Sequence, residues 1–560
     1  MIAGQDCGIS GRERAAVVTL LGFAVVLKIA ATFRYRINSD EPQHLHVVWG
    51  WVQGLLPYRD FFDNHPPLFH VLMVPALLAA GERADAVVVM RLAMLPLYAA
   101  ALALTYRLGT RVGSPRAGLA AAVVLGLHYD FLLRSTEFRT DNLWTVLWLA
   151  ALVVMAGGPA TVVRTLAWSL VLGAALCVSQ KTVLLVCALL IAAGLNLALS
   201  GPRAGKGRWA RTAALGTAAV GGFAAVPLAV SGFFAARGAL GALVSCTVAH
   251  NALPGLGAWQ HPWRLAILPA GLAVTAILAA PGLRAPSADA PRVMRIFLVL
   301  VGVGYLLLLE GVWPLVTGQD FLPLLPLAAI VVGQGFAAWE ARRSTRPGWG
   351  GLPAAVLGTF VLAELAVVVG KGPIWRDRTA DEVGLVADVL RLTDAGQAVM
   401  DTKGEALFRP RPFYPVLETI SIARLRRGLM ADTIPEDLVR SRCYVAVKDS
   451  DRFPARGRAF LEENYLAVGR LRVAGRLLDA RGGGSGERPF EIAVPGPYAI
   501  VDARGAASGT LDGTRYDGPR LLGGGRHAFA PAGAERELAA VWAQAISRGF
   551  TPFAAAGGGR

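Results

Sequence analysis

Long apolar stretches alternate with short polar segments over roughly the first 370 residues of the chain. A helix needs about 20 mostly apolar residues to cross the hydrocarbon core of a bilayer. Stretches near this length occupy residues 15–33, 86–106, 117–133, 143–157, 162–179, 182–199, 212–234, 265–282, 296–312, 321–339 and 352–370. We therefore predict an α-helical polytopic membrane protein with about 11 transmembrane helices.

The composition agrees with this pattern. Of the 560 residues, 54% are hydrophobic and 17% are charged, whereas soluble globular proteins are about 25% charged. The net charge of +16 is explained by Lys and Arg in short cytoplasmic loops together with a general preference for Arg. Nucleic-acid binding is excluded as a function, because no basic face interleaved with aromatic residues is present.

Lys and Arg concentrate in every second loop, starting with Arg12 and Arg14 before the first apolar stretch. Short loops rich in Lys and Arg stay on the cytoplasmic side. The other loops of this kind contain Arg107, Arg111, Arg116, Arg164, Arg203, Lys206, Arg208, Arg211, Arg284, Arg292, Arg295, Arg342, Arg343 and Arg346. This alternation predicts a multi-pass protein of the cytoplasmic (inner) membrane, with a cytoplasmic N-terminus and periplasmic or extracytoplasmic C-terminal regions.

The first outer loop, residues 38–70, concentrates titratable side chains in a mostly apolar chain. Its acids and histidines are Asp40, Glu41, Asp60, Asp63, His44, His46, His65 and His70. Such groups at the edge of a bilayer are costly and usually functional. Within the loop, residues 41–52 and 67–80 are expected to form short amphipathic helices along the interface.

Other charged residues are expected on the same outer side. Arg134, Arg139, Lys181 and Arg264 fall at helix ends, where they suit phosphate binding or simply extend toward the headgroups. For Glu137 and Asp141 the sequence leaves three roles open: binding a metal, orienting an acceptor, or pairing with the neighbouring arginines. Asp320 precedes a Pro-containing helix and is a further candidate for contact with a donor.

Beyond residue 370 the composition becomes typical of a soluble protein. Residues 371–480 are predicted to form an α/β domain, with buried strands near 398–401 and 444–448. Residues 481–487 are a Gly-rich linker. Residues 488–545 are expected to form a small β-sandwich-like module, starting with a hairpin. We expect the first domain, residues 1–370, to carry the catalytic site.

Several motifs of the first outer loop resemble the GT-C superfamily, in particular protein O-mannosyltransferases and lipid A aminoarabinose transferases. The motifs are Asp40-Glu41, Gly54, Pro57-Tyr58-Arg59-Asp60 and Asn64-His65-Pro66-Pro67-Leu68, and they are followed by the outer acidic turn at residues 137–142. The resemblance covers about residues 1–370 and implies a polyprenyl-phosphate sugar donor, membrane lipids as partners and transfer on the outer face.

The chain also departs from these relatives, which often carry Glu-Lys before Pro-Pro, whereas this chain has Asn64-His65. A lysine that serves the donor phosphate is therefore missing at this place. The role of a metal-binding glutamate is equally in doubt, with Asp63 as its alternative. A divalent metal is a further expectation, for which Asp63, His65 and His261 are the candidates.

The implied chemistry is inverting displacement, with Asp40 as general base and Glu41 either catalytic or bracing the loop. Asp63, His65, Arg134, Glu137, Arg139, Asp141, Lys181, Arg264 and Asp320 are the candidate donor- and acceptor-binding residues. The acceptor is a hydroxyl on a protein, a lipid or a polysaccharide. The alternative for Asp40 is N-capping of the helix that follows. The alternatives for the protein are a lipid or sugar transporter or flippase, and a scaffold. Transporters usually show related halves, of which the sequence gives no sign.

Overall fold

The computed structural model describes residues 11–200, 208–257, 290–343, 352–372, 374–448, 450–478, 486–533 and 537–553, together with 269, 270 and 273. The chain packs as two compact units. The helical unit comprises Met1–Ile37, Asn64–Ala76 and Val87–Thr379, and the sheet unit comprises Asn38–Asp63, Leu77–Ala86 and Ala380–Arg560. The first outer loop is thus divided, and most of it packs with the C-terminal part of the chain.

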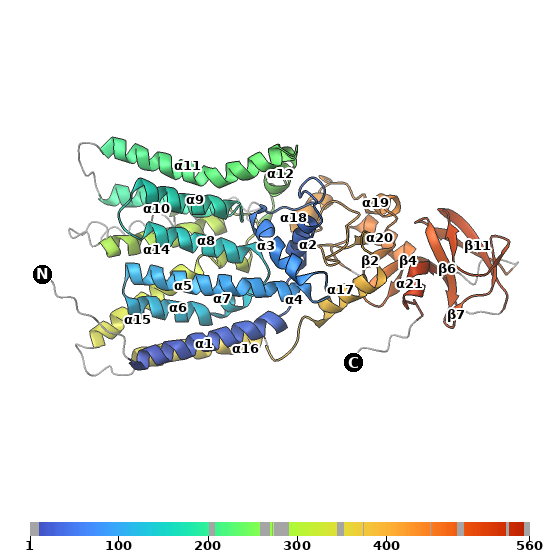
Figure 1. The fold of residues 1–560 in the computed structure, drawn as a ribbon, viewed down its shortest axis with the longest axis horizontal. Helices are drawn as coiled ribbons and strands as arrows, with labels where there is room; N and C mark the ends of the chain where they lie inside the picture. Colours follow the sequence, from blue (N-terminus) through green and yellow to red (C-terminus); the bar gives the residue numbers. More distant parts are fainter. Residues whose placement is uncertain are drawn as a thin grey trace. The chain divides into compact units, whose positions relative to one another are not determined.

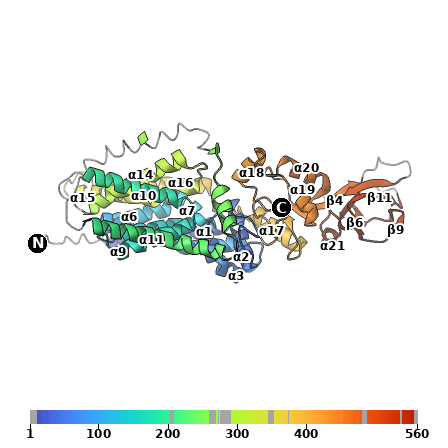
Figure 2. The ribbon, with the colours of Figure 1, turned by 90° about the horizontal axis from the view of Figure 1, so that it is seen from above.

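The described part of the helical unit consists of helices of different lengths, and the long ones run side by side (Figures 1 and 2). They are α1 (Gly11–Arg34), α3 (Leu68–Ala80), α4 (Ala86–Met90), η1 (Arg91–Ala93), α5 (Met94–Val112), α6 (Pro115–Leu127), α7 (Tyr129–Arg134), α8 (Thr140–Met155), α9 (Val162–Leu176), α10 (Thr182–Ser200), α11 (Arg208–Ala235), α12 (Leu240–Val244), η2 (Ser245–Ala249), α14 (Ala290–Val312), η5 (Gly318–Phe321), α15 (Leu325–Arg343) and α16 (Leu352–Lys371). Each predicted apolar stretch contains a helix, except 265–282, of which only residues 269, 270 and 273 are described.

Among the described residues, four helices are long and apolar enough to cross a membrane, judged by length and composition. They are Gly11–Arg34, Ala86–Val112, Trp209–Ala235 and Pro291–Val312. Several others are apolar but shorter. The stretch expected as one span at 117–133 is interrupted at His128, whose backbone is extended between α6 and α7. The number of about 11 spans therefore stays a prediction.

Glycines let neighbouring helices of this unit approach closely. A Cβ on Gly118 of α6 would lie 2.5 Å from the carbonyl oxygen of Tyr106 in α5. In the same way, a Cβ on Gly173 of α9 would lie 2.3 Å from the carbonyl oxygen of Phe223 in α11. Small residues at such contacts favour helix association where burial from water supplies little driving force.

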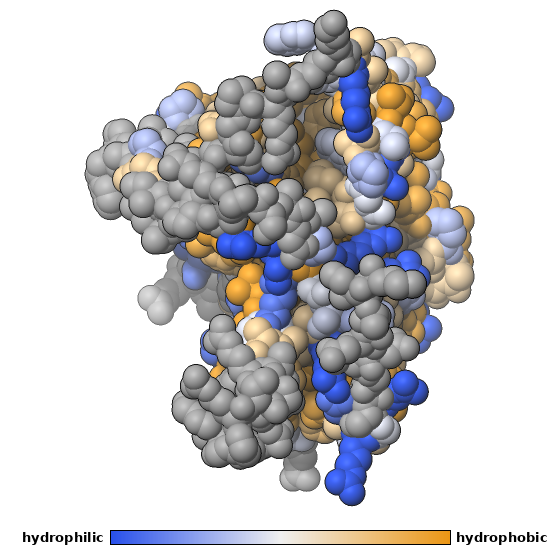
Figure 3. Space-filling model, turned by 90° about the vertical axis from the view of Figure 1, so that its left-hand side faces the viewer, coloured by the Kyte–Doolittle hydropathy of each residue, from blue (hydrophilic) through white to orange (hydrophobic). Residues whose placement is uncertain are grey.

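Several of the expected cytoplasmic arginines gather at one end of the helical unit. Arg116 in the first turn of α6 pairs with Glu13 in the first turn of α1 at 3.3 Å. Arg111 at the end of α5 donates to the carbonyl of Val153 at the end of α8. Figure 3 faces the end of the molecule where α1 begins and shows hydrophilic side chains there, with apolar ones around them. We call this the basic end.

The sheet unit contains short helices and two sheets. Its elements are α2 (Asp40–Val52), α17 (Ala380–Leu392), β1 (Val399–Met400), α18 (Thr419–Arg426), α19 (Ile434–Arg440), β2 (Val445–Val447), α20 (Ala455–Asn464), β3 (Tyr465–Val468), β4 (Leu471–Leu478), β5 (Arg488–Ile492), β6 (Gly496–Asp502), β7 (Gly505–Ala506), β8 (Gly509–Leu511), β9 (Thr514–Tyr516), β10 (Arg520–Leu522), β11 (Gly525–Pro531), β12 (Leu538–Trp542) and α21 (Ala543–Ser547). The strands expected near 398–401 and 444–448 are β1 and β2, and they pair in parallel.

The larger sheet has the order β1-β2-β4-β12-β6-β10, with β3 on β4 and β7 on β6. The smaller sheet has the order β5-β11-β8-β9. Strand β12 pairs antiparallel with β4, from Leu538 opposite Leu478 to Val541 opposite Gly475. Strands from before and after the expected linker therefore share one sheet and one buried apolar core. The domain boundaries at 371–480 and 488–545 remain predictions.

Candidate active site

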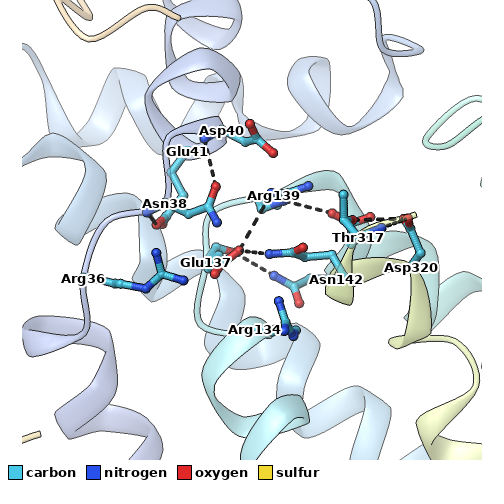
Figure 4. Close-up of polar contacts among 12 residues, drawn as sticks. Arg36, Asn38, Asp40, Glu41, Arg134, Glu137, Arg139, Asn142, Thr317 and Asp320 are labelled. Carbon is cyan, nitrogen blue, oxygen red and sulfur yellow. Dashed lines mark hydrogen bonds and ion pairs between the residues drawn. The ribbon is translucent and has the colours of Figure 1, made fainter. Parts of the chain in front are cut away.

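Three of the candidate residues lie together where α7 gives way to α8. Arg139 has an extended backbone just before α8, and its Nε donates to Oδ2 of Asp141 at 3.0 Å. A guanidinium nitrogen of Arg139 also lies 3.9 Å from Oε2 of Glu137. All three side chains are buried. One arginine thus joins the two acids of this turn. Figure 4 shows Arg139 beside Glu137.

The short helix η5 connects this turn with two further candidate residues, Asp320 and Lys181. Its Gln319 donates from Nε2 to Oε2 of Glu137 at 2.8 Å. The next residue, Asp320, forms an ion pair with Lys181 from the turn between α9 and α10. The carboxylate of Asp320 also accepts from the backbone N–H of Thr317 at 2.7 Å. Asp320 is fully buried, whereas the Lys181 side chain is 20% exposed, so protein encloses the carboxylate of this ion pair.

Gly318, the first residue of η5, lies against the side chain of Arg134. A Cβ at this position would lie 2.1 Å from Cζ of Arg134, so the guanidinium occupies the space that a side chain would fill. Arg134 also donates from Nε to Asp130 at 2.9 Å, one turn earlier in α7. Gly318, Gln319 and Asp320 therefore contact Arg134, Glu137 and Lys181 in that order. We call Arg134, Glu137, Arg139, Asp141, Lys181, Gln319 and Asp320 the polar cluster.

His65 belongs to the same unit and lies beside the turn that carries Lys181. The carbonyl of the preceding residue, Asn64, accepts from Nε2 of Gln180 at 3.0 Å and from Nδ2 of Asn251 at 3.0 Å. The His65 ring lies edge-on to His70, with 6.4 Å between ring centroids. The segment before Pro66 is thus fixed by side chains from two other parts of the chain.

Asp40 and Glu41 open helix α2 in the sheet unit. The helix follows Ser39, whose side chain makes no capping hydrogen bond. Glu41 instead accepts from the backbone N–H of Asn38 at 2.8 Å (Figure 4). The Asp40 carboxylate forms an ion pair with Lys403, which comes from the segment between β1 and α18. The Asp40 side chain is 26% exposed and that of Lys403 is 6% exposed.

Lys403 is a residue that sequence reasoning missed. It lies in a loop at residues 401–411, which we call the Lys403 loop. Asp401 accepts from the backbone N–H groups of Gly404 at 3.0 Å and Ala406 at 2.9 Å. Glu405 accepts from the backbone N–H of Lys403 itself at 2.6 Å. The signal in the sequence was the polar run Asp-Thr-Lys-Gly-Glu directly after a predicted buried strand.

The Lys403 loop packs directly on α2. Nδ1 of His46 lies 2.7 Å from the carbonyl oxygen of Leu407, and because a carbonyl only accepts, Nδ1 carries the proton. Burial and the nearby positive charge of Arg411 lower the pKa of His46 from 6.5 to about 4. His46 is therefore neutral at pH 7. The aromatic hydroxyl of Tyr414 donates to the carbonyl of Tyr58, which holds a second part of the first outer loop.

The remaining candidates are Asp63, Arg264 and His261. Asp63 is fully buried in the sheet unit. Arg264 and His261 lie outside the described residues. Within the described ranges, no three His, Cys, Asp or Glu side chains converge as ligands of a metal ion would. The described residues therefore show no cluster that would hold the expected divalent metal, and its presence stays a prediction.

No protein-family model matches the sequence, and no curated protein matches it either. Among solved structures, ArnT from Cupriavidus metallidurans in the apo state aligns with a TM-score of 0.51 at 13% identity, over 83% of this chain and 98% of ArnT. ArnT bound to undecaprenyl phosphate aligns with a TM-score of 0.50 at 12% identity, over 82% of this chain and 98% of ArnT. AglB from Archaeoglobus fulgidus gives a TM-score of 0.47 at 11% identity, over 82% of this chain and 73% of AglB.

At these identities the likeness concerns the fold. It extends over most of both chains in the case of ArnT, including the sheet-containing region after the helices. The resemblance noted in the first outer loop is thereby confirmed at the level of structure. The chain has the fold of ArnT.

Proposed function

We propose that this protein is a membrane glycosyltransferase that uses a polyprenyl-phosphate-linked sugar as donor. The acceptor is a hydroxyl of a protein, a lipid or a polysaccharide on the outer face of the cytoplasmic membrane. The observation that carries the proposal is the fold shared with ArnT over 83% of the chain. The solved form of ArnT that contains undecaprenyl phosphate supports a donor of this chemical class.

The proposed reaction is a single displacement. The acceptor oxygen attacks the anomeric carbon of the sugar, and its proton passes to the carboxylate of Asp40. The bond between the anomeric carbon and the phosphate oxygen breaks, and polyprenyl phosphate leaves with the bonding electrons. Because a phosphate is a weakly basic leaving group, a base and stabilising cations are sufficient, and no general acid is required. The anomeric configuration is inverted.

Arg134, Arg139 and Lys181 are the proposed cations for the donor phosphate. Each is held beside a carboxylate around η5, so the cluster already orients positive groups. Arginine suits a phosphate because its planar fork of donors matches two oxygens. Asp130 holds Arg134, Glu137 and Asp141 hold Arg139, and Asp320 holds Lys181. We also assign Asp63, His65 and Arg264 to donor or acceptor binding, and Glu41 to holding the backbone beside Asp40.

The polar cluster and the basic end support an outward-facing site. Asp141 opens α8, and Val153 near the other end of this helix accepts from Arg111 at the basic end. A helix of 16 residues is about 24 Å long, which is close to the thickness of the hydrocarbon core. Arginine-rich ends stay in the cytoplasm. The N-terminus is therefore proposed to be cytoplasmic and the polar cluster to face outward.

The test is mass spectrometry of polyprenyl-phosphate sugars and surface glycans from cells with and without the protein. The same measurement on Asp40→Asn is expected to show a loss of transfer of about 100-fold or more, because a general base is removed. Asp85→Asn is the matched control, since Asp85 is an exposed acid of the same unit that pairs with Arg83. Full transfer by Asp40→Asn would exclude Asp40 as base. Movement of a lipid-linked sugar across the membrane without its consumption would indicate a flippase.

A further inference from the structure

We infer that Lys403 is a positioning residue for the proposed general base, so that the C-terminal region supplies part of the catalytic machinery. This inference rests on the proposed transfer reaction with Asp40 as base. Its starting point is the ion pair between Lys403 and Asp40, two residues separated by 363 positions in the chain. The motifs of the first outer loop contain no lysine, and the resemblance they carry ends before residue 371.

The exposure of the two side chains differs in a way that suits this role. The Lys403 side chain is 6% exposed, so its ammonium group is enclosed by protein and depends on the carboxylate for compensation. The Asp40 side chain is 26% exposed, so it remains accessible while the lysine holds it. An acid that takes up a proton from a substrate must be reachable, whereas the group that orients it need not be.

The Lys403 loop presents its lysine in a fixed position. Asp401 binds the backbone on the C-terminal side of Lys403, through Gly404 and Ala406, and it also pairs with Arg411 at 3.0 Å. Glu405 binds the backbone of Thr402 at 2.9 Å and that of Lys403 at 2.6 Å. Both carboxylates are therefore engaged within the loop, and the ammonium group of Lys403 extends toward α2.

The same loop is anchored to the helix that carries Asp40. His46, which follows Asp40 in α2 by about 1.7 turns, donates to the carbonyl of Leu407. A Cβ on Gly404 would lie 3.1 Å from the carbonyl oxygen of Pro42 and 3.2 Å from Cα of Gln43, so the loop packs closely against the first turn of the helix. Lysine and aspartate are thus held on two elements that pack together. This arrangement fixes the direction of the carboxylate, and geometry of this kind strongly affects the rate of a chemical step.

The inference predicts a specific kinetic change in the full-length protein reconstituted with a polyprenyl-phosphate sugar. Lys403→Met is expected to lower kcat about tenfold or more while the KM for the donor changes less than about twofold, because orientation of the base acts on the chemical step. Lys403→Arg retains a cation and is expected to recover most of kcat. Lys448→Met is the matched control, since Lys448 is an exposed lysine of the same unit.

Thermal unfolding of each variant shows whether it is folded, and Lys403→Arg keeps the test valid if Lys403→Met is not. An increase in donor KM with unchanged kcat in Lys403→Met would overturn the inference, because it would make Lys403 a donor-binding residue. Unchanged kcat and KM would overturn it as well. Asp40→Asn distinguishes failure of the proposed general base from failure of the Lys403 inference. If Asp40→Asn is fully active, the proposed role of Asp40 fails. If it is inactive and Lys403→Met turns over normally, only the present inference fails.

Discussion

Gly404 lies so close to His46 that a Cβ at position 404 would stand 2.9 Å from the Cβ of His46. The backbone of Gly404 has a φ of +85°, a conformation that residues with a side chain rarely adopt. Glycine at this position is therefore required twice, once by its own dihedral angle and once by the neighbouring helix. The contact is what brings the Lys403 loop against α2.

Gly404→Ala is expected to destabilise the sheet unit by about 2–5 kcal/mol, because the strain of a left-handed residue adds to a steric clash. Gly396→Ala is the matched control, since Gly396 has a φ of +84° and a Cβ added there would meet nothing within 4 Å. This control is expected to cost only about 1–2 kcal/mol. Thermal or denaturant unfolding measures both. Equal losses of stability in the two variants would show that the Lys403 loop can move away from α2 at little cost.

The low pKa of His46 predicts a loss of stability on acidification. The folded protein keeps this histidine neutral down to about pH 4, whereas the unfolded chain takes up a proton near pH 6.5. The free energy of unfolding is therefore expected to fall by about 3 kcal/mol as the pH is lowered from 6.5 to 4. Below that range, this histidine contributes no further loss.

The measurement for this second prediction is unfolding of the full chain between pH 4 and pH 8. His46→Gln keeps a donor for the Leu407 carbonyl but does not titrate. Its stability is expected to be lower at neutral pH and to depend less on pH over this range. A variant with the same slope as the natural sequence would show that other groups cause the acid sensitivity.

Lys181→Met is expected to destabilise the helical unit by about 3–5 kcal/mol, because it leaves the buried carboxylate of Asp320 without its cation. Arg83→Ala, which breaks the exposed pair with Asp85, is the comparison and is expected to cost less than about 1 kcal/mol. Adding Asp320→Asn to Lys181→Met should recover part of the loss. Thermal unfolding in detergent tests this, and a loss as small as that of Arg83→Ala would contradict an enclosed ion pair.

Gly318→Ala is expected to reduce transfer with little effect on stability. The new methyl group would meet the end of the Arg134 side chain. This side chain is flexible and can move away at small cost in stability. The guanidinium would then no longer lie beside η5. Transfer rates of Gly318→Ala, Arg134→Ala and the double variant provide the measurement. If both changes act through the same guanidinium, the double variant is no worse than Arg134→Ala. Additive losses would indicate separate effects.

Much of the helical unit follows from local pattern. The apolar stretches predict α1, α5, α8 and α14, because a long apolar stretch is satisfied only by a helix in lipid. The short helices of the first outer loop are also confirmed, as α2 and α3. Not predicted was the interruption at His128. The break falls at the polar residues His128 and Asp130, but two polar residues within a long apolar stretch do not by themselves show that a helix ends there.

Contacts between segments that are far apart in the sequence were harder to predict. The sequence indicates strands on both sides of residues 481–487, but not that β12 joins β4 in one sheet. The candidate residues of the polar cluster were found individually by their charge and their place at helix ends. Their grouping depends on η5, whose Gly318 attracts no attention by composition. Lys403 was missed because the polar run after the predicted strand at 398–401 does not reveal that its lysine meets Asp40, which is 363 positions earlier in the chain.

By itself, the sequence determined where the chain is helical and apolar, where titratable residues accumulate, and that Asp40 follows the first apolar helix. These properties depend on near neighbours, through hydrophobic periodicity and the conformational limits of proline and glycine. Only the tertiary structure decided that Asp40 meets Lys403 and that η5 joins Arg134, Glu137 and Lys181. Such contacts are made through space between distant segments, and a charged side chain carries no mark in the sequence of the partner that will neutralise it.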